Sequence, residues 1–298
     1  MADIKLFNIN GKVKELQSGT VTLEKELQNT IEKNMKTFFG VTFLKSEFRT
    51  TDGGRMDSIG IDENNCPVIF EYKRSLNENV INQGLFYLNW LLDHKDSFTL
   101  LVMDILGPEK SKVIDWTRPR IICVANDFTK FDVSAINQMT RNISLIRYKK
   151  FENDLLMFEQ INEKVVDQIE DVNTLEKRSK NYQKTFTEKY NESSVKIKNL
   201  YDDLKTEILS YGDEVTENTL KFYTAFKKIQ NFICVEIFKE ELLLHLKLDP
   251  ATVTFEKGFT RNVTDIGHYG TGDVELHIRS QSDLTKARDL LLRAYQEN

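Results

Sequence analysis

The sequence predicts an α/β domain with the element order helix, three strands, helix, strand, followed by a smaller α+β domain. Three observations predict it. Two helical apolar repeats flank three strand-like runs that turn residues separate, and further strand-like runs follow the second repeat. A polar, charged stretch then divides the 298 residues into two parts, each long enough to bury a core. This order is typical of an α/β sandwich and not of a doubly wound sheet.

The first domain, residues 1–162, is expected to open with a hairpin and a helix. Asn10-Gly11 lies between two short strand-like runs and is typical of a type I′ turn. Residues 22–38 repeat apolar side chains at helical spacing, and Thr22 can cap their N-terminus. Three strands are expected next, at 41–49, 54–62 and 67–73, followed by a helix at 77–92 that Asn77 caps. Further strands are expected at 98–104, 120–125 and 143–149, and they alternate with short helices.

Residues 163–194 are expected to form a charged helical linker, because they are polar and contain neither Pro nor Gly. A solvated helix with no role beyond spacing explains this composition. The second domain, residues 195–298, is expected to be a small α+β domain of unknown role. Its expected elements are a helix at 195–210, three strands within 222–249, a loop at 258–273, a strand at 274–280 and a helix at 283–297.

Composition argues against several classes of protein. No apolar run reaches the roughly 20 residues that span a bilayer, and the N-terminus lacks an apolar signal core, so no membrane partner is expected. Cys66, Cys123 and Cys234 are widely spaced, which predicts reduced, mostly buried thiols in a cytoplasmic protein and no structural zinc site. The net charge of −5 divides into +2 for residues 1–150 and −7 for residues 151–298, which permits DNA binding by the first domain.

Asp57, Glu71 and Lys73 form the candidate catalytic set. Side chains alternate along a strand, so Glu71 and Lys73 share one face, and a hairpin turn at residues 63–65 returns Asp57 beside Glu71. Two carboxylates can hold Mg²⁺ or Mn²⁺ through oxygen, and an ammonium can orient a water or neutralise charge on a phosphate. The set therefore predicts phosphodiester hydrolysis, with a surface salt-bridge cluster on a hairpin as the alternative.

These residues belong to a longer pattern over residues 22–92. Its parts are a helical Glu24, then Gly54-Arg55-Met56-Asp57, then Phe70-Glu71-Tyr72-Lys73, and then Gln83 four residues before Tyr87. In the order and spacing of these parts, the sequence resembles the PD-(D/E)XK nuclease superfamily, in its NucS-like and RecB-like branch. The resemblance implies a restriction-endonuclease-like core and a metal-dependent deoxyribonuclease that acts on DNA in repair or in defence against foreign DNA.

The resemblance also implies a further metal-site carboxylate on the first helix, and Glu24 and Glu26 are the two choices. Glu24 borders the apolar stripe of the helix, whereas Glu26 shares its face with polar residues on the solvent side. Glu24 is therefore preferred as the acid that joins Asp57 and Glu71 in catalysis and metal binding.

Four further side chains have expected roles at this site. By resemblance, Gln83 would contact the metal-bound water or the scissile phosphate, and a helix-surface amide is the alternative. Tyr87 would contact DNA, or would only pack beneath the site. Arg55 and Arg74 flank the carboxylates and would bind phosphates, or would be solvated surface charges.

The loop at 258–273 carries a second candidate site. Arg261, His268 and Asp273 lie among glycines that let a backbone approach a ligand closely, and His and Arg suit a phosphate or carboxylate. A tight structural loop in which His268 satisfies backbone groups is the alternative. The segment resembles a small uncharacterised domain found after such nuclease modules. That resemblance names no activity, and we expect a substrate-sensing or partner-binding role rather than a second catalytic centre.

Two other classes of function stand as alternatives to a nuclease. One is a non-catalytic nucleic-acid-binding module that keeps the fold, which predicts DNA binding that survives EDTA. The other is a structural protein whose linker and acidic second half recruit a partner, which predicts no DNA binding even at low salt. The sequence leaves open the preferred DNA structure, endonuclease or exonuclease action, and the oligomeric state, with a homodimer among the options.

Overall fold

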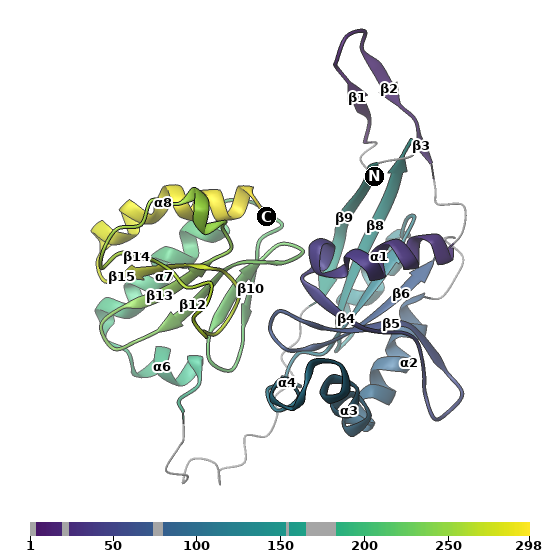
Figure 1. Cartoon of the computed structure of the whole chain (residues 1–298), viewed down its shortest axis with the longest axis horizontal. Coiled ribbons are helices and arrows are strands. Elements are labelled where there is room, and N and C mark those ends of the chain that lie inside the picture. The colour runs from purple at the N-terminus through teal and green to yellow at the C-terminus, as the bar shows by residue number, and fades with distance from the viewer. Residues whose placement is uncertain (1–3, 20–23, 74–79, 153–154, 165–182) are drawn as a thin grey trace. The chain divides into compact units, whose positions relative to one another are not determined.

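The computed structural model describes residues 4–19, 24–73, 80–152, 155–164 and 183–298. The chain divides into two compact units, Met1–Ile169 and Glu170–Asn298. Each unit has its own mixture of helices and strands, drawn in Figure 1. None of the helices in the described part of the chain has the length and apolar content that a bilayer crossing requires.

The first unit is built on a seven-stranded mixed sheet. Its strands are β3 (Ser18–Gly19), β8 (Asn142–Phe151), β7 (Arg120–Ala125), β6 (Pro67–Lys73), β5 (Arg55–Asp62) and β4 (Val41–Arg49), in that order, with β9 (Leu155–Lys164) paired to β8 as well. β6, β7 and β8 run parallel to one another, whereas β4, β5 and β6 form antiparallel pairs. β6 is thus an interior strand with a partner on each side, which buries the residues that it carries.

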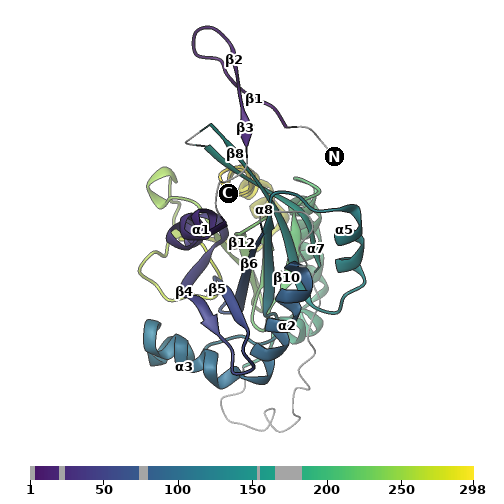
Figure 2. The ribbon, with the colours of Figure 1, turned by 90° about the vertical axis from the view of Figure 1, so that its right-hand side faces the viewer.

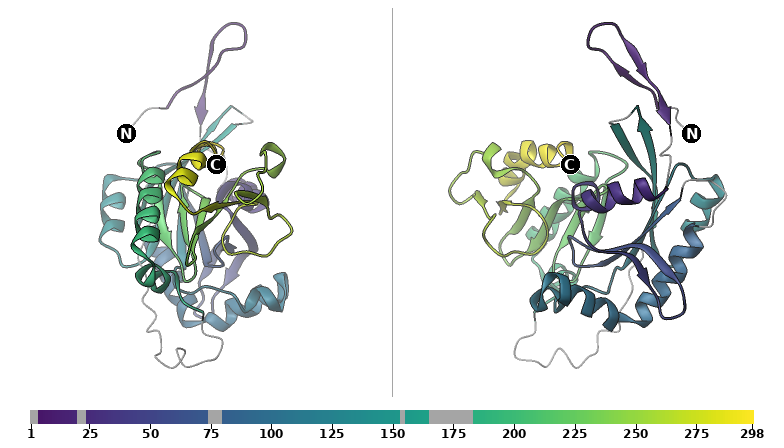
Figure 3. Two further views of the ribbon diagram at one scale, coloured as in Figure 1. Left: turned by 90° about the vertical axis from the view of Figure 1, so that its left-hand side faces the viewer. Right: turned by 45° about the vertical axis from the view of Figure 1, so that its right-hand side comes forward.

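Helices cover both faces of this sheet. α1 (Glu24–Phe39) packs on one face, where the rings of Phe39 and Phe70 meet at 5.3 Å between centroids. α2 (Val80–Asp93) and α5 (Lys130–Asn137) share a core cluster with Ile69 of β6 and cover the other face. Figure 2 shows α1 and α5 on opposite sides of the strands, and Figure 3 shows α1, in purple, lying across the strands. α3 (Lys95–Leu106) and α4 (Pro108–Ser111) follow α2.

The N-terminal hairpin is present, although its turn differs from the prediction. β1 (Leu6–Asn8) pairs with β2 (Lys14–Leu16), with Asn8 opposite Lys14. Residues 9–13 therefore connect the strands, so the connection is longer than the two-residue type I′ turn expected at Asn10-Gly11. Gly11 still adopts a left-handed conformation with φ of +80°, which glycine tolerates without strain.

One predicted strand of the first unit is wrong. Residues 98–104 lie within helix α3, in which Phe98 and Val102 are buried four residues apart while Leu100 and Met103 are exposed. A short apolar run fits either a strand or a buried helix by periodicity alone, and here the burial has the spacing of a helix. The cap residues expected for the first two helices, Thr22 and Asn77, lie outside the described residues.

The second unit is a six-stranded antiparallel sheet with helices packed on it. The strands are β10 (Thr216–Thr219), β11 (Thr224–Lys227), β12 (Asn231–Ile237), β13 (Leu242–Leu246), β15 (Val274–Ile278) and β14 (Thr260–Asn262), in spatial order. The helices are α6 (Phe186–Glu192), α7 (Val195–Leu209) and α8 (Gln281–Gln296), with a short 3₁₀ helix, η2 (Pro250–Thr252). α7 and α8 share a core cluster with one face of the strands.

Helix α6 lies within the stretch that the sequence predicted as a linker. Its residue Phe186 is 4% exposed and belongs to the core of the second unit, and its backbone N–H donates a 2.8 Å hydrogen bond to the carbonyl of Lys221. Thr185 caps the helix: its Oγ1 accepts a hydrogen bond from the backbone N–H of Glu188, and its own backbone N–H donates to Oε2 of Glu188. The described part of 183–194 is therefore part of the second unit, and the predicted linker was too long at its C-terminal end.

Candidate active site

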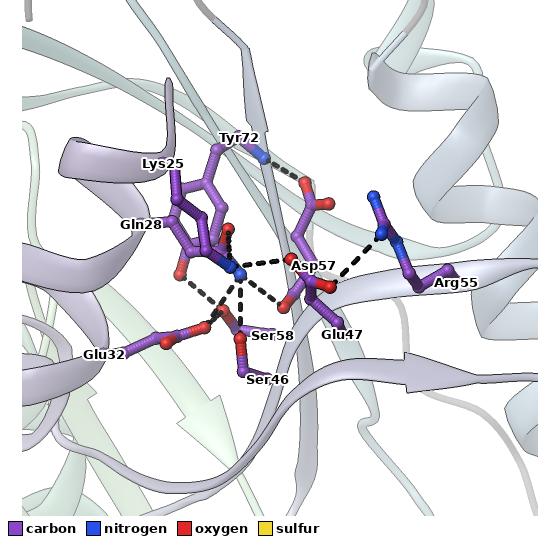
Figure 4. A network of polar contacts seen from close by, with 9 residues as sticks. All are labelled: Lys25, Gln28, Glu32, Ser46, Glu47, Arg55, Asp57, Ser58 and Tyr72. Carbon is purple, nitrogen blue, oxygen red and sulfur yellow. Dashed lines mark hydrogen bonds and ion pairs between the residues drawn. The ribbon is translucent and has the colours of Figure 1, made fainter. Parts of the chain in front are cut away.

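The pairing of β5 with β6 brings Asp57 and Glu71 together. In this antiparallel pair Ser58 lies opposite Phe70, which sets Asp57 and Glu71 next to each other across the ladder. The backbone N–H of Asp57 donates to Oε1 of Glu71 at 3.2 Å. The backbone N–H of Tyr72 donates to Oδ2 of Asp57 at 3.0 Å, a contact drawn in Figure 4. Backbone groups thus hold both carboxyl groups in place.

The electrostatics of this pair are unfavourable for two anions. Glu71 is fully buried, and its Oε2 has no hydrogen-bond partner among the described residues. Burial, reinforced by the charge of Asp57, raises the pKa of Glu71 to about 9. Burial also raises the pKa of Asp57, although the hydrogen bond from Tyr72 and the charge of Lys73 oppose that shift. A cation would stabilise these two adjacent carboxyl groups, because Oε2 of Glu71 lacks a hydrogen-bond donor among the described residues.

Lys73 lies at the end of the same strand and faces Glu24 of helix α1. Its Nζ lies 3.9 Å from Oε1 of Glu24, and its side chain is 15% exposed. Glu26 points elsewhere, with Oε1 3.3 Å from Nζ of Lys150. Of the two acids weighed from the sequence, Glu24 is thus the one that reaches a member of the candidate catalytic set.

The expected cluster of three acids does not form. Within the described ranges, no group of three His, Cys, Asp or Glu side chains is positioned to hold a metal ion. Glu24 begins helix α1 and lies beside the ammonium of Lys73 instead of joining Asp57 and Glu71. The geometry therefore places Asp57 beside Glu71 and places Glu24 beside Lys73.

Tyr87 packs beneath the Gly54–Asp57 segment. Its side chain is 6% exposed, and its hydroxyl accepts hydrogen bonds from the backbone N–H of Arg55 at 3.2 Å and from Nε2 of Gln83 at 3.4 Å. A Cβ atom at Gly54 would lie 2.7 Å from the Tyr87 ring, so the close approach requires glycine. The packing alternative for Tyr87 fits this placement better than direct DNA contact. Gln83 supports the same hydroxyl.

The two arginines of the predicted set have different outcomes. Arg55 has a side chain that is 54% exposed, and its Nη1 lies 3.2 Å from Oε2 of Glu47. Lys25 pairs with the other oxygen of Glu47 at 2.7 Å, and its hydrogen bond and charge lower the pKa of Glu47. Arg55 is therefore a solvated charge that remains accessible to a phosphate. Arg74 lies outside the described residues.

A buried polar network behind Asp57 was not predicted from the sequence. Gln28 of α1 is 5% exposed, and its Nε2 donates to the carbonyl oxygen of Asp57 at 2.8 Å and lies within reach of Glu32 and Ser46. Figure 4 shows these contacts converging on Gln28. The network ties helix α1 to the backbone of the site residue. Gln28 and Glu32 stand four residues apart beside the apolar stripe of the helix, which is the signal that could have indicated them.

Two residues of the strands complete this network. Oγ of Ser58 donates to Oε1 of Glu32 at 2.6 Å, and the hydroxyl of Tyr72 donates to Oγ of Ser58 at 3.1 Å. Ser58 and Tyr72 are both fully buried. Each follows directly in the chain after a site acid, so the network on the α1 side fixes the strands from which Asp57 and Glu71 project.

The candidate residues of the second unit separate into two groups. Arg261 and His268 line a cleft on the sheet face opposite α7 and α8, whereas Asp273 is not among the lining residues. Arg261 forms a two-pronged hydrogen bond with Glu275, at 2.8 and 3.0 Å. Nδ1 of His268 lies 2.8 Å from the carbonyl oxygen of Ile266, which is the backbone contact that the structural-loop alternative anticipated.

Comparison with known proteins identifies relatives of the whole chain and of its second unit. Over 297 residues the chain is 30% identical to an uncharacterized protein of Haemophilus influenzae, a match that covers 96% of this chain and 97% of the relative. Residues 186–298 match the model of a domain of unknown function, DUF5655.

Two solved structures resemble part of the chain. One is a repair endonuclease from Pyrococcus abyssi, with 18% identity, a TM-score of 0.30 and coverage of 43% of this chain and 49% of that chain. The other is a complex of EndoMS with double-stranded DNA, with 20% identity, a TM-score of 0.26 and coverage of 43% and 47%. The chain thus spans about half the length of each of these structures.

Proposed function

The chain belongs to the family of the Haemophilus influenzae protein that it matches over nearly its whole length, and we propose that its first unit is a divalent-metal-dependent deoxyribonuclease of the PD-(D/E)XK type. The observation that carries this proposal is the pair of Asp57 and Glu71. Glu71 is fully buried, its Oε2 has no hydrogen-bond partner among the described residues, and Asp57 lies directly beside it. A structural ion pair would hold a cationic side chain at that oxygen.

The residues fit Mg²⁺ or Mn²⁺. Mg²⁺ in proteins is commonly held by one or two carboxylates, with waters and substrate phosphates completing its shell, so two acids are sufficient. Asp57 and Glu71 would hold the ion, and the unpartnered Oε2 is the atom that such an ion would satisfy. When bound, the metal supplies a Lewis acid for the phosphate and an acidified water.

The chain's own residues would position and neutralise the substrate. The ammonium of Lys73 lies at the C-terminal end of the strand that carries Glu71, where it would stabilise charge that develops on a phosphate. Glu24, 3.9 Å away, orients that ammonium. Arg55, on the strand of Asp57 and more than half exposed, provides a further phosphate contact. Tyr87 and Gln28 hold the backbone of residues 55 and 57 from opposite sides.

The element order supports a restriction-endonuclease-like core for this unit. Helix α1, strands β4, β5 and β6, helix α2 and strand β7 follow one another in the order expected from the sequence. The two acids stand on adjacent central strands, between helices that cover both faces. Such a site is held rigidly by packing, as catalysis by positioning requires.

A cleavage assay tests the proposal. Single-stranded and double-stranded DNA would be incubated with the full chain and Mn²⁺ or Mg²⁺, in parallel with Asp57→Asn and Glu71→Gln. Glu109→Gln serves as the matched control, because Glu109 is an 85% exposed carboxylate of the same unit. We expect cleavage by the wild type and the control, and a loss of about a hundredfold or more in the two site variants. Cleavage by the wild type no faster than by Asp57→Asn would refute the proposal.

A further inference from the structure

The sheet of the second unit has one apolar and one polar face. On β12, Val235 and Ile237 face the core that includes α7 and α8, and Glu236 between them faces the other way. The same alternation puts His245 of β13 and Glu275 of β15 on the side of Glu236. This polar face is hollowed into an open cleft of about 630 Å³. The lining residues that concern its chemistry are Glu236, His245, Arg261, His268, Tyr269 and Glu275.

Arg261 forms an ion pair with Glu275. Its Nε and Nη2 donate to the two carboxylate oxygens at 2.8 and 3.0 Å, and Nε2 of His277 lies 3.2 Å from the same carboxylate. Burial alone would raise the pKa of Glu275, but the hydrogen bonds and charge of Arg261 lower it. Glu275 is thus an ionised, satisfied group, and Arg261 has no excess charge to offer an anion.

Glu236 is the carboxylate of the cleft that lacks a donor. The residue is 6% exposed, and no hydrogen bond or ion pair of its side chain is found among the described residues. Burial raises its pKa, and the charge of Lys189 is the first of the influences that oppose the shift. In an open cleft, the hydrogen-bond donors that this carboxylate needs come from water or from a bound ligand.

His245 is a second polar group left unsatisfied in the same place. It is fully buried, and neither ring nitrogen has a hydrogen-bond partner in the described ranges; the nearest carboxylate oxygen, Oε2 of Glu275, is 3.4 Å from Nε2. Its ring stacks on that of His268, with 4.2 Å between centroids. Burial lowers the pKa of His245 to about 4, so the neutral ring retains one acceptor nitrogen.

An aromatic ring stands at the rim of the cleft. Tyr269 is 38% exposed, and its ring packs against Phe222 and Tyr223 with centroids 5.1 and 6.4 Å away. The loop that carries it fits tightly on the sheet, because a Cβ atom at Gly270, whose φ is +83°, would lie 2.5 Å from Cβ of Cys234. The loop therefore presents a fixed aromatic surface beside the unsatisfied acceptors.

We propose that this cleft binds an organic cation with several N–H donors, a guanidinium or a primary ammonium group, with Glu236 as its counter-ion and the rings of Tyr269 and His268 as its walls. Unpaired acceptors call for donors, and an aromatic face attracts a cation. The carboxylates and histidines that line the cleft do not form a metal-binding group of three among the described residues. A phosphate would meet Glu236 without a free arginine to offset it.

Such a cation can come from a free small molecule or from a side chain of a peptide. Calorimetric titration of the full chain distinguishes these sources with three probes: agmatine, spermidine, and a blocked Gly-Arg-Gly peptide. Saturable binding of agmatine or spermidine that matches or exceeds that of the peptide indicates the free molecule, and tighter binding of the peptide indicates a side chain. In either case we expect Glu236→Gln to weaken binding about tenfold.

The control is Glu240→Gln, which removes an exposed carboxylate shortly after the same strand and should leave the affinity unchanged. A thermal melt of each variant verifies that the second unit remains folded. The proposal is overturned if the folded wild type binds none of the three probes, or if Glu236→Gln binds them as tightly as the wild type. It is also overturned if an anionic ligand, guanosine monophosphate, binds while the cations do not. Asp57→Asn should bind the cations normally, so this test does not depend on nuclease activity.

Discussion

The backbone N–H of Asp57 donates a 3.2 Å hydrogen bond to Oε1 of Glu71, whereas Oε2 of Glu71 has no hydrogen-bond partner among the described residues. One oxygen of a fully buried carboxylate is thus held by the protein, and the other is left for a group that the described chain does not provide. Because a buried acceptor without a donor or cation is costly, this pair should couple the stability of the first unit to divalent metal.

Glu71→Gln is expected to stabilise the metal-free protein at pH 7.5 by about 1–3 kcal/mol. Burial and the charge of Asp57 raise the pKa of Glu71 to about 9, so the folded protein must bind a proton that the unfolded chain does not hold. The amide avoids that requirement. Stability of the metal-free wild type should therefore fall as the pH rises from about 5 to about 9, and the fall should be smaller in the variant. Urea unfolding in EDTA across this pH range measures both effects.

Divalent metal should stabilise the wild type and not the Glu71→Gln variant. Mn²⁺ should raise the unfolding temperature of the wild type and leave that of Glu71→Gln unchanged, because the variant lacks the anionic oxygen that would hold the ion. If the acids instead belonged to a structural salt bridge, Glu71→Gln would be less stable than the wild type in EDTA, and Mn²⁺ would affect neither protein.

Gln28→Ala should destabilise the first unit by about 1–3 kcal/mol and lower DNA cleavage, because it removes the 2.8 Å hydrogen bond to the carbonyl of Asp57 and breaks a buried network. Asn29→Ala is the matched control, since this neighbouring amide side chain is exposed on the same helix. Urea unfolding and cleavage rates give the two readouts. Equal behaviour of the two variants would show that the contact does not position Asp57.

Tyr87→Phe distinguishes packing from DNA contact. The change removes the acceptor of the Arg55 N–H but keeps the ring, so it should cost about 1 kcal/mol of stability. Because the side chain is 6% exposed, the affinity for DNA should not change. Fluorescence anisotropy of labelled DNA, measured in Ca²⁺ with Asp57→Asn as the background, tests this. An affinity loss of tenfold would support a direct DNA contact instead.

Glu24→Gln and Glu26→Gln should differ in cleavage rate. Glu24 lies 3.9 Å from the ammonium of Lys73, whereas Glu26 pairs with Lys150, so only the first change should slow cleavage, by less than about tenfold. The Mn²⁺ concentration that gives half-maximal rate should stay the same, because Glu24 is placed with the lysine and not with the two acids. A marked rise in that concentration would identify Glu24 as a metal ligand.

Local patterns in the sequence determined much of the first unit. The strands expected at 41–49 and 67–73 are found at those residues, and the expected helix at 22–38 is found as Glu24–Phe39. Alternation along a strand and the turn between two strands are properties of neighbouring residues, so they also indicated that Asp57 and Glu71 would lie side by side. The run at 98–104 was misjudged because a short apolar segment has no decisive period.

Tertiary structure alone decided what surrounds those two acids. Glu71 is buried because β6 has a partner strand on each side. Gln28 supports Asp57 because α1 crosses the sheet at that point. Glu24 is the neighbour of Lys73 because α1 begins there. Tertiary structure alone also decided that Phe186 belongs to the core of the second unit and that Glu236 lies unpaired in the cleft. Contacts between residues far apart in the chain depend on register and packing, whereas a local pattern records only which face of an element is buried.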